Sequence, residues 1–197
     1  MSNEVKTEIA AVAARLVVEE GLEYGPAKHR ALRELGLSGR SSLPDNDLLE
    51  DQVMDYVQLF CSDTQPQELR ALRELALRWM QQLEAFRPHL SGAVWRGTAT
   101  RLSDIHIQLF CDDPKSAELA LIDQGVRYEV HSVKGFRGET VDVLSIHSLC
   151  PRLHEDIGVH LMIHDHDDLR GALLLDGRGR AQRGGIQALR QLLDNAA

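Results

Sequence analysis

Residues 92–113 read GAVWRGTATRLSDIHIQLFCDD, and this stretch contains the clearest strand pattern in the second half of the chain. From Asp104 to Phe110 the residues alternate with the period of a β-strand that has one buried face. Ile105, Ile107 and Leu109 form the apolar side. The opposite side carries Asp104, His106, Gln108 and Phe110. The pattern therefore predicts a strand that presents a carboxylate and an imidazole two residues apart on one face.

The segments around this strand predict a small mixed α/β unit over residues 91–197. A helix is expected over 114–123, capped by Asp112 or Asp113 and ended by Gly125. Apolar and β-branched runs predict further strands at 93–95, 128–133, 140–146 and 159–164. A glycine-rich loop over 176–185 precedes a final helix that ends near Asp194.

The first 90 residues instead show apolar residues spaced three or four apart, which is typical of amphipathic helices. Helices are expected over 4–20 and 26–35, then from an N-cap at Asp47, and finally over 64–86. Pro88 closes the region. The predicted fold class is α+β, with an N-terminal helical bundle (1–90) packed on a small mixed-sheet domain (91–197).

Composition limits the classes of partner. The 197 residues carry a formal net charge of −8, so nucleic acid is an unlikely partner because phosphate binding needs a cationic face. No apolar run is long enough to span a membrane, and the N-terminus lacks the pattern of a secretory signal. Three widely separated cysteines, Cys61, Cys111 and Cys150, fit a reducing compartment. We therefore expect a cytoplasmic protein without a membrane partner.

Three features of residues 90–150 occur in a recognisable order. After GTATRLSDIHIQLF come Asp112-Asp113-Pro114 with a helix, and later the run GETVDVLS over 138–145. This order resembles the minimal nucleotidyltransferase domains of the DNA polymerase β-like superfamily. Their plan is a strand ending in Gly-Ser, a turn, a Ser-Asp-Ile-Asp-Leu strand, a helix after Asp-Asp-Pro and a later Val-Asp-Val strand.

The resemblance implies transfer of a nucleoside monophosphate from an NTP to a hydroxyl on a protein or small molecule. Two Mg²⁺ or Mn²⁺ ions would hold the triphosphate and the attacking oxygen. By this resemblance Asp104 binds metal, and Asp142 is the third carboxylate, which orients the acceptor. Gly97 and Thr98 form the phosphate turn. Arg96 and Arg101 flank that turn and are further candidates for phosphate binding.

His106 stands where this superfamily has its second metal-binding carboxylate. It is predicted to be an atypical ligand beside Asp104 and Asp142, because an imidazole offers nitrogen to ions that prefer oxygen. Two hypotheses follow from this replacement. The chain is either a metal-dependent nucleotidyltransferase or a catalytically degenerate module that keeps the fold for nucleotide or partner recognition.

A third hypothesis is a transition-metal protein built on His160 and His164, which share one face of the strand at 159–164 with Met162. Scattered strand and loop histidines would produce the same spacing. In the glycine-rich loop, Arg178, Arg180 and Arg183 are either phosphate ligands or part of a solvated linker. The helical half offers an amphipathic surface that either binds a protein partner or supports the sheet.

Overall fold

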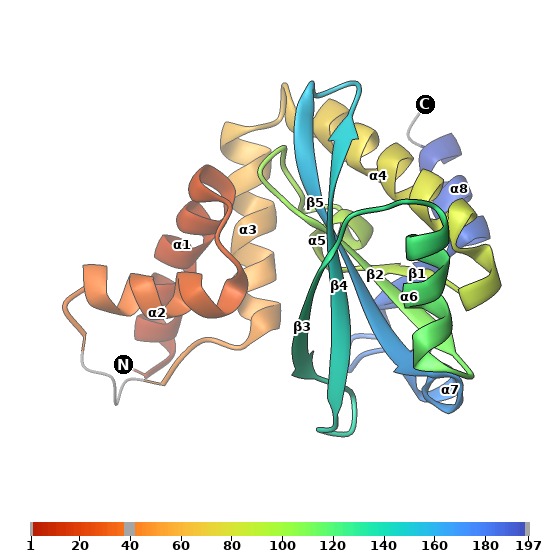
Figure 1. The fold of residues 1–197 in the computed structure, drawn as a ribbon. Helices are drawn as coiled ribbons and strands as arrows, with labels where there is room; N and C mark the ends of the chain where they lie inside the picture. Colours follow the sequence, from red (N-terminus) through yellow and green to blue (C-terminus); the bar gives the residue numbers. More distant parts are fainter. Residues whose placement is uncertain (1, 38–41, 196–197) are drawn as a thin grey trace. The chain divides into compact units, whose positions relative to one another are not determined.

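The computed structural model describes residues 2–37 and 42–195 and has the α+β class predicted from the sequence (Figure 1). Four helices come first along the chain: α1 (Ser2–Glu20), α2 (Tyr24–Glu34), α3 (Asn46–Phe60) and α4 (Gln65–Gln82). The strands follow, with shorter helices between them. Among the described helices, none combines the length and the apolar character that crossing a bilayer requires.

The chain folds into two compact units. The first consists of the residues up to Glu68 together with Thr98–Leu102, and the second consists of Leu69–Gly97 together with the chain from Ser103 onward. Most of α4 therefore belongs to the unit that contains the sheet. Residues 69–90, which the sequence pattern groups with the helical region, lie in this second unit.

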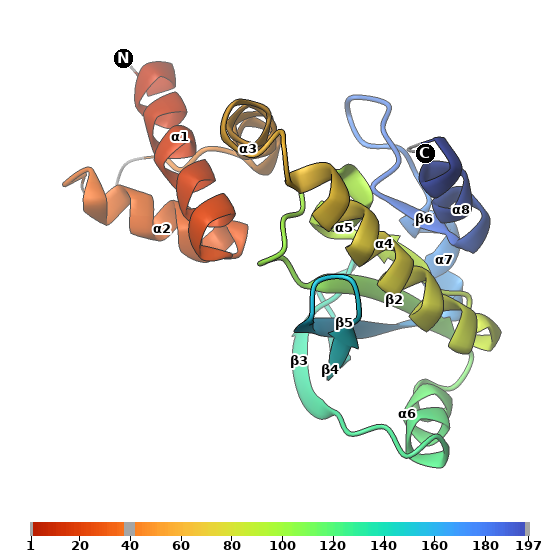
Figure 2. The ribbon, with the colours of Figure 1, turned by 90° about the horizontal axis from the view of Figure 1, so that it is seen from above.

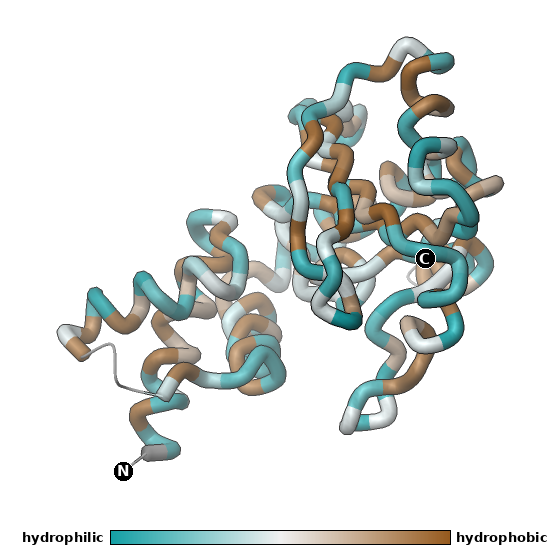
Figure 3. The backbone as a smooth tube through the Cα atoms, turned by 60° about the horizontal axis from the view of Figure 1, so that its bottom comes forward, coloured by the Kyte–Doolittle hydropathy of each residue, from teal (hydrophilic) through white to brown (hydrophobic). Residues whose placement is uncertain are grey.

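The first unit has its own apolar core, contributed by α1, α2 and α3. Ile9, Ala13 and Leu16 of α1 are buried against Leu49 and Val53 of α3. Hydrophobic and hydrophilic stretches alternate along these helices, as amphipathic packing requires (Figure 3).

The start of α3 differs from the prediction by two residues. Its N-cap is Asp45 and not Asp47: the Leu48 N–H donates to Asp45 Oδ1 at 2.8 Å. Both aspartates suit an N-cap, but only the side chain that precedes the first helical residue can accept from the first turn.

The second unit contains, within the described residues, a six-stranded mixed sheet in the order β3-β4-β5-β2-β1-β6. The strands are β1 (His89–Ser91), β2 (Ile105–Cys111), β3 (Glu129–Lys134), β4 (Thr140–Cys150), β5 (Glu155–Asp165) and β6 (Arg183–Gly185). Neighbours pair in antiparallel fashion, except that β2 and β5 are parallel. At the β6 end of the sheet lies the final helix, α8 (Ile186–Asn195) (Figure 2).

Two predicted elements of this unit were wrong. Residues 93–95 lie in a short helix, α5 (Gly92–Arg96), because Gly92 and Gly97 adopt left-handed φ values of 71° and 94° and turn the chain at both ends. The helix predicted over 64–86 ends at Gln82, and a 3-10 turn, η1 (Glu84–Phe86), follows it. Helix α6 (Pro114–Asp123) is confirmed, with Asp113 as its N-cap. The sequence pattern missed two short elements, η2 (His166–Asp168) and α7 (Leu169–Ala172).

The two faces of the sheet differ: helices contact one of them, and the other carries a group of histidines. On one face, Trp79 of α4 donates to Ser148 of β4 through Nε1 at 2.9 Å. The end of α6 approaches the same place, because Gln124 and Val126 line a pocket together with Trp79 and Ser148. The opposite face carries His106, His131, Ser145 and His160, and we refer to it as the histidine face.

A glycine in β6 provides a test of packing in the second unit. A Cβ at Gly184 would lie 2.0 Å from Cη2 of Trp95, whose indole N–H donates to the Ala181 carbonyl at 2.8 Å. Gly184→Ala should therefore lower the free energy of unfolding by roughly 1–3 kcal/mol, the usual cost of overpacking, measured by urea denaturation. Gly177→Ala is the matched control, since nothing lies within 4 Å of its Cβ position. Equal stability of the two variants would contradict this packing.

Candidate functional site

The candidate site lies on the histidine face, where strand register aligns polar residues from four strands. His106 of β2 pairs with His160 of β5 and with Ser91 of β1, and His160 pairs with Ser145 of β4. Directly paired residues of neighbouring strands project to the same side of a sheet. The register therefore forms a row in the order Ser145, His160, His106 and Ser91, from segments far apart in the sequence.

Within this row, His160 joins a carboxylate to a hydroxyl. Its Nε2 lies 3.1 Å from Asp104 Oδ2, and its Nδ1 lies 2.8 Å from Ser145 Oγ. An ionised carboxylate only accepts hydrogen bonds, so with neutral His160 the Nε2 carries the proton and donates to Asp104. Nδ1 then accepts from the Ser145 hydroxyl. The arrangement can move a proton between Ser145 and His160 while Asp104 fixes the imidazole tautomer.

The surroundings of Asp104 keep its carboxylate ionised. The hydrogen bond from His160 lowers the pKa of Asp104, and partial burial opposes this shift. The charges of His160 and His106 and the backbone N–H of Gly158 lower the pKa further. Gly158 is required for this approach, because a Cβ there would lie 2.5 Å from Asp104 Oδ1. The carboxylate therefore lies directly against the backbone of β5.

Two further imidazoles surround His160. His106 stacks on it with ring centroids 5.1 Å apart and an interplanar angle of 27°. His131 meets it edge-on at 6.2 Å, and its Nδ1 lies 3.3 Å from Ser145 Oγ. The site therefore combines one carboxylate, the hydroxyls of Ser145 and Ser91, and three imidazoles, which are groups suited to proton transfer and to binding anions or soft cations.

Asp142 does not join this group. It is three residues from Ser145 in β4, and successive side chains of a strand alternate between faces, so the two point to opposite sides. The Ser132 hydroxyl donates to Asp142 Oδ1 at 3.2 Å, and Lys115 of α6 lies close enough for its charge to interact with this carboxylate. The structure thus brings together Asp104 and His106 of the predicted metal set, but not Asp142.

The predicted phosphate turn is divided between the two units. Gly97 is the left-handed C-cap of α5 directly after Arg96, whereas Thr98 and Arg101 belong to the first unit. The glycine beside His106 is Gly92, where a Cβ would lie 3.4 Å from Cδ2 of that histidine.

Sequence reasoning missed the roles of several residues of this face. It did not identify Ser91, Gly92, Ser145 and Gly158. Ser91 and Gly92 are visible in the sequence as a Ser-Gly pair directly after Leu90. Ser145 and Gly158 belong to the site because of strand register, and no local sequence pattern indicates them.

A second group of potential metal ligands lies elsewhere in the second unit. Within the part of the chain that the structure describes, one set of three His, Cys, Asp or Glu residues has ligand atoms all within 4.8 Å of one another, and it consists of Glu139, His164 and Asp168. Of the histidines proposed as transition-metal ligands from the sequence, His164 belongs to this set. His160 instead belongs to the hydrogen-bonded chain with Asp104.

Comparison with known proteins does not assign the chain to a family. No model of a protein family matches the chain, and a search of curated proteins finds no match to its sequence. The chemistry of the site must therefore be argued from its geometry.

The Asp104–His160 hydrogen bond predicts a pH dependence of stability. Because the folded-state pKa of Asp104 is lowered, its contribution is present above the ordinary aspartate pKa of about 4 and is lost as the pH falls through the folded-state value. Wild type should be more stable than Asp104→Asn at pH 7, and this difference should close below about pH 4. Urea denaturation between pH 7 and pH 3 measures it.

The control places Asp104→Asn in a His160→Gln background, where the largest cause of the lowered pKa is removed. In that background the stability difference caused by Asp104→Asn should depend less on pH. A stability difference that is the same at pH 7 and pH 3 in the wild-type background would contradict the hydrogen bond.

The contact between Gly158 and Asp104 gives a second prediction. The methyl group of Gly158→Ala would displace the carboxylate, so the pKa of Asp104 should rise toward its ordinary value and stability should fall by roughly 1–3 kcal/mol. Carboxyl ¹³C chemical shifts followed against pH measure the pKa directly. Gly171→Ala is the control, because nothing lies within 4 Å of its Cβ position. An unchanged Asp104 titration in Gly158→Ala would show that the close approach is wrong.

Proposed function

We propose that the second unit is a nucleotide-binding module of the nucleotidyltransferase type in which histidine replaces the second metal-binding carboxylate. One observation carries the proposal: the two neighbouring strand positions beside Asp104 hold His106 and His160, while Asp142 points to the other face. This favours recognition of a nucleotide over two-metal transfer.

The order of elements supports a relation to these domains. Strand β1 ends at Ser91, Gly92 turns the chain, and β2 begins directly after Asp104. Helix α6 then follows Asp112-Asp113-Pro114. This matches the plan of a strand ending in a glycine–serine turn, an aspartate-bearing strand and a helix. The turn differs in that its residues occur as Ser-Gly.

The residues present do not fit a pair of Mg²⁺ ions. Two-metal transfer needs carboxylates that converge on both ions, and Mg²⁺ strongly prefers oxygen ligands. His106 and His160 offer nitrogen, and both nitrogens of His160 already take part in hydrogen bonds. Asp104 is the one sequence-predicted carboxylate on this face.

Donors on the histidine face suit the phosphates of a nucleotide. Ser91 of β1 pairs with His106 of β2, so a hydroxyl and an imidazole share one register position. Imidazole N–H and hydroxyl groups can both donate to a phosphate oxygen. The guanidinium of Arg183 lies elsewhere, over the Phe136 ring at 4.9 Å, and donates to the Ala172 carbonyl.

Calorimetric titration with ATP, CTP, GTP and UTP tests the proposal. We expect one of them to bind in the presence of a chelator as well as with Mg²⁺, because the protein donors and not a metal pair hold the phosphates. His106→Ala should weaken binding by about tenfold or more, the value of a hydrogen bond to a charged group. Asp142→Asn is the matched control and should keep the wild-type affinity.

Labelled nucleotides separate binding from catalysis. With α-labelled NTPs and Mg²⁺ or Mn²⁺, a binding module should transfer no label to itself or to an extract. Transfer that is lost in Asp104→Asn would instead establish the enzyme hypothesis. Failure to bind any of the four nucleotides would contradict both.

A further inference from the structure

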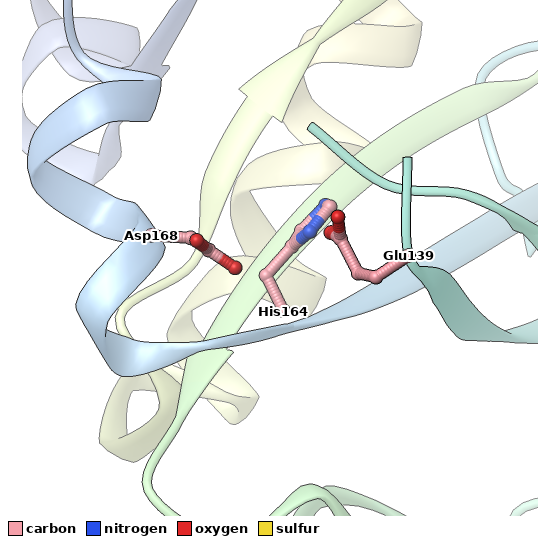
Figure 4. A group of neighbouring side chains, drawn as sticks. All are labelled: Glu139, His164 and Asp168. Atoms are coloured by element: carbon pink, nitrogen blue, oxygen red, sulfur yellow. The ribbon is translucent and has the colours of Figure 1, made fainter. Parts of the chain in front are cut away.

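A second cluster of polar side chains lies toward the other end of the histidine face. Glu139 directly precedes β4, His164 lies near the end of β5, and Asp168 ends η2. Figure 4 shows the His164 ring between the two carboxylates. Each residue offers one ligand atom, and these atoms all lie within 4.8 Å of one another.

His164 is buried without a hydrogen-bond partner. Its side chain is 1% exposed, and neither Nδ1 nor Nε2 has a hydrogen-bond partner among the described residues. The ring stacks on Phe136 at 4.3 Å and on Phe110 at 5.5 Å, and these two aromatic rings also stack on each other, so His164 lies in an aromatic cluster. Buried polar groups in native proteins are almost always satisfied, so this imidazole points to a ligand that the protein chain itself does not supply.

Each of the two carboxylates is held by Arg137 through one of its oxygens. Glu139 Oε2 accepts from the Arg137 backbone N–H at 2.8 Å, while Oε1 is buried and has no partner in the described structure. Asp168 is 8% exposed, and its Oδ1 lies 2.9 Å from Nη2 of Arg137. Anchoring of this kind holds ligand oxygens in place before an ion arrives.

Burial favours the neutral form of His164. Burial is the largest cause of its lowered pKa, and the charge of Arg183 acts in the same direction, whereas Asp168 and Glu139 raise the pKa. A neutral imidazole has the lone pair that a metal needs. Arg137 forms an ion pair with Asp168, whereas Glu139 forms none among the described residues.

We propose that Glu139, His164 and Asp168 bind one divalent transition-metal ion, through one imidazole nitrogen and one oxygen from each carboxylate. A set of one nitrogen and two oxygens suits Zn²⁺, Mn²⁺ or Co²⁺. With bonds of about 2.1 Å, ligand atoms in a tetrahedral site lie roughly 3.4 Å apart, so a small movement of the side chains completes the coordination.

Three protein ligands leave a coordination position for solvent or a small ligand. A pocket of about 260 Å³ adjoins the cluster, and its wall includes Asp168, Arg137 and Arg183. It provides the route by which an ion and an exchangeable ligand reach the site. The proposal does not depend on nucleotide binding, which concerns His106 and Asp104 near the opposite end of β2.

Metal binding to the full chain, without a tag and freed of metal by a chelator, tests the site. We expect one equivalent of Zn²⁺, Co²⁺ or Mn²⁺ by elemental analysis, a rise in melting temperature and, with Co²⁺, visible absorption bands. His164→Phe keeps an aromatic ring beside Phe110 and Phe136 and should abolish tight binding of the metal equivalent. Glu139→Gln keeps an oxygen that can accept from Arg137 and should weaken binding at least tenfold.

Two control variants separate this site from other histidines. His147→Gln removes an exposed imidazole of β4, and His160→Gln removes the imidazole beside Asp104. Both variants should still bind one equivalent of metal. The proposal is overturned if no metal binds, if Glu139→Gln and His164→Phe bind as wild type does, or if His160→Gln abolishes binding. Should His164→Phe fail to fold, Glu139→Gln decides the outcome.

Discussion

The parallel pairing of β2 with β5 is the interaction on which both clusters depend. It aligns Ile105–Cys111 with Val159–Asp165, segments separated by more than forty residues of chain. This register puts Asp104 beside Gly158 and His106 beside His160, and it fixes which face His164 occupies. A slip of one residue would move every side chain of one strand to the other face. The buried apolar row of Ile105, Ile107 and Leu109 opposes such a slip, because it would lose its place in the core.

Local periodicity was sufficient to predict most elements of the fold. The alternation around Ile107 predicted β2, and the cap at Asp113 with the glycine at 125 predicted the bounds of α6. Residues 93–95 were misassigned because three apolar residues fit a strand and a helical turn equally well. Their flanking glycines, both left-handed, were the better guide, since they bend the chain at each end of a single helical turn.

The candidate site was harder to predict, because alternation within one strand does not reveal which faces of separate strands coincide. Asp104 and His106 share a face for local reasons, and that part followed from the sequence. Asp142 was assigned to the same site by resemblance, yet the register of β4 on β5 turns it to the opposite side. Ser145 and Gly158 contribute only through register and close approach, so no single segment of sequence identifies them.

His160 and His164 lie on the same face of one strand, and their surroundings give them different chemistry. Both ring nitrogens of His160 already have partners, Asp104 and Ser145, so a metal could bind there only by breaking a hydrogen bond. His164 has no such bond to lose among the described residues, and two anchored carboxylates lie beside it. A cation therefore gains more at His164, whereas His160 is held in the tautomer that suits proton transfer. The four-residue spacing of these histidines places both on the face, but their partners decide what each one can bind.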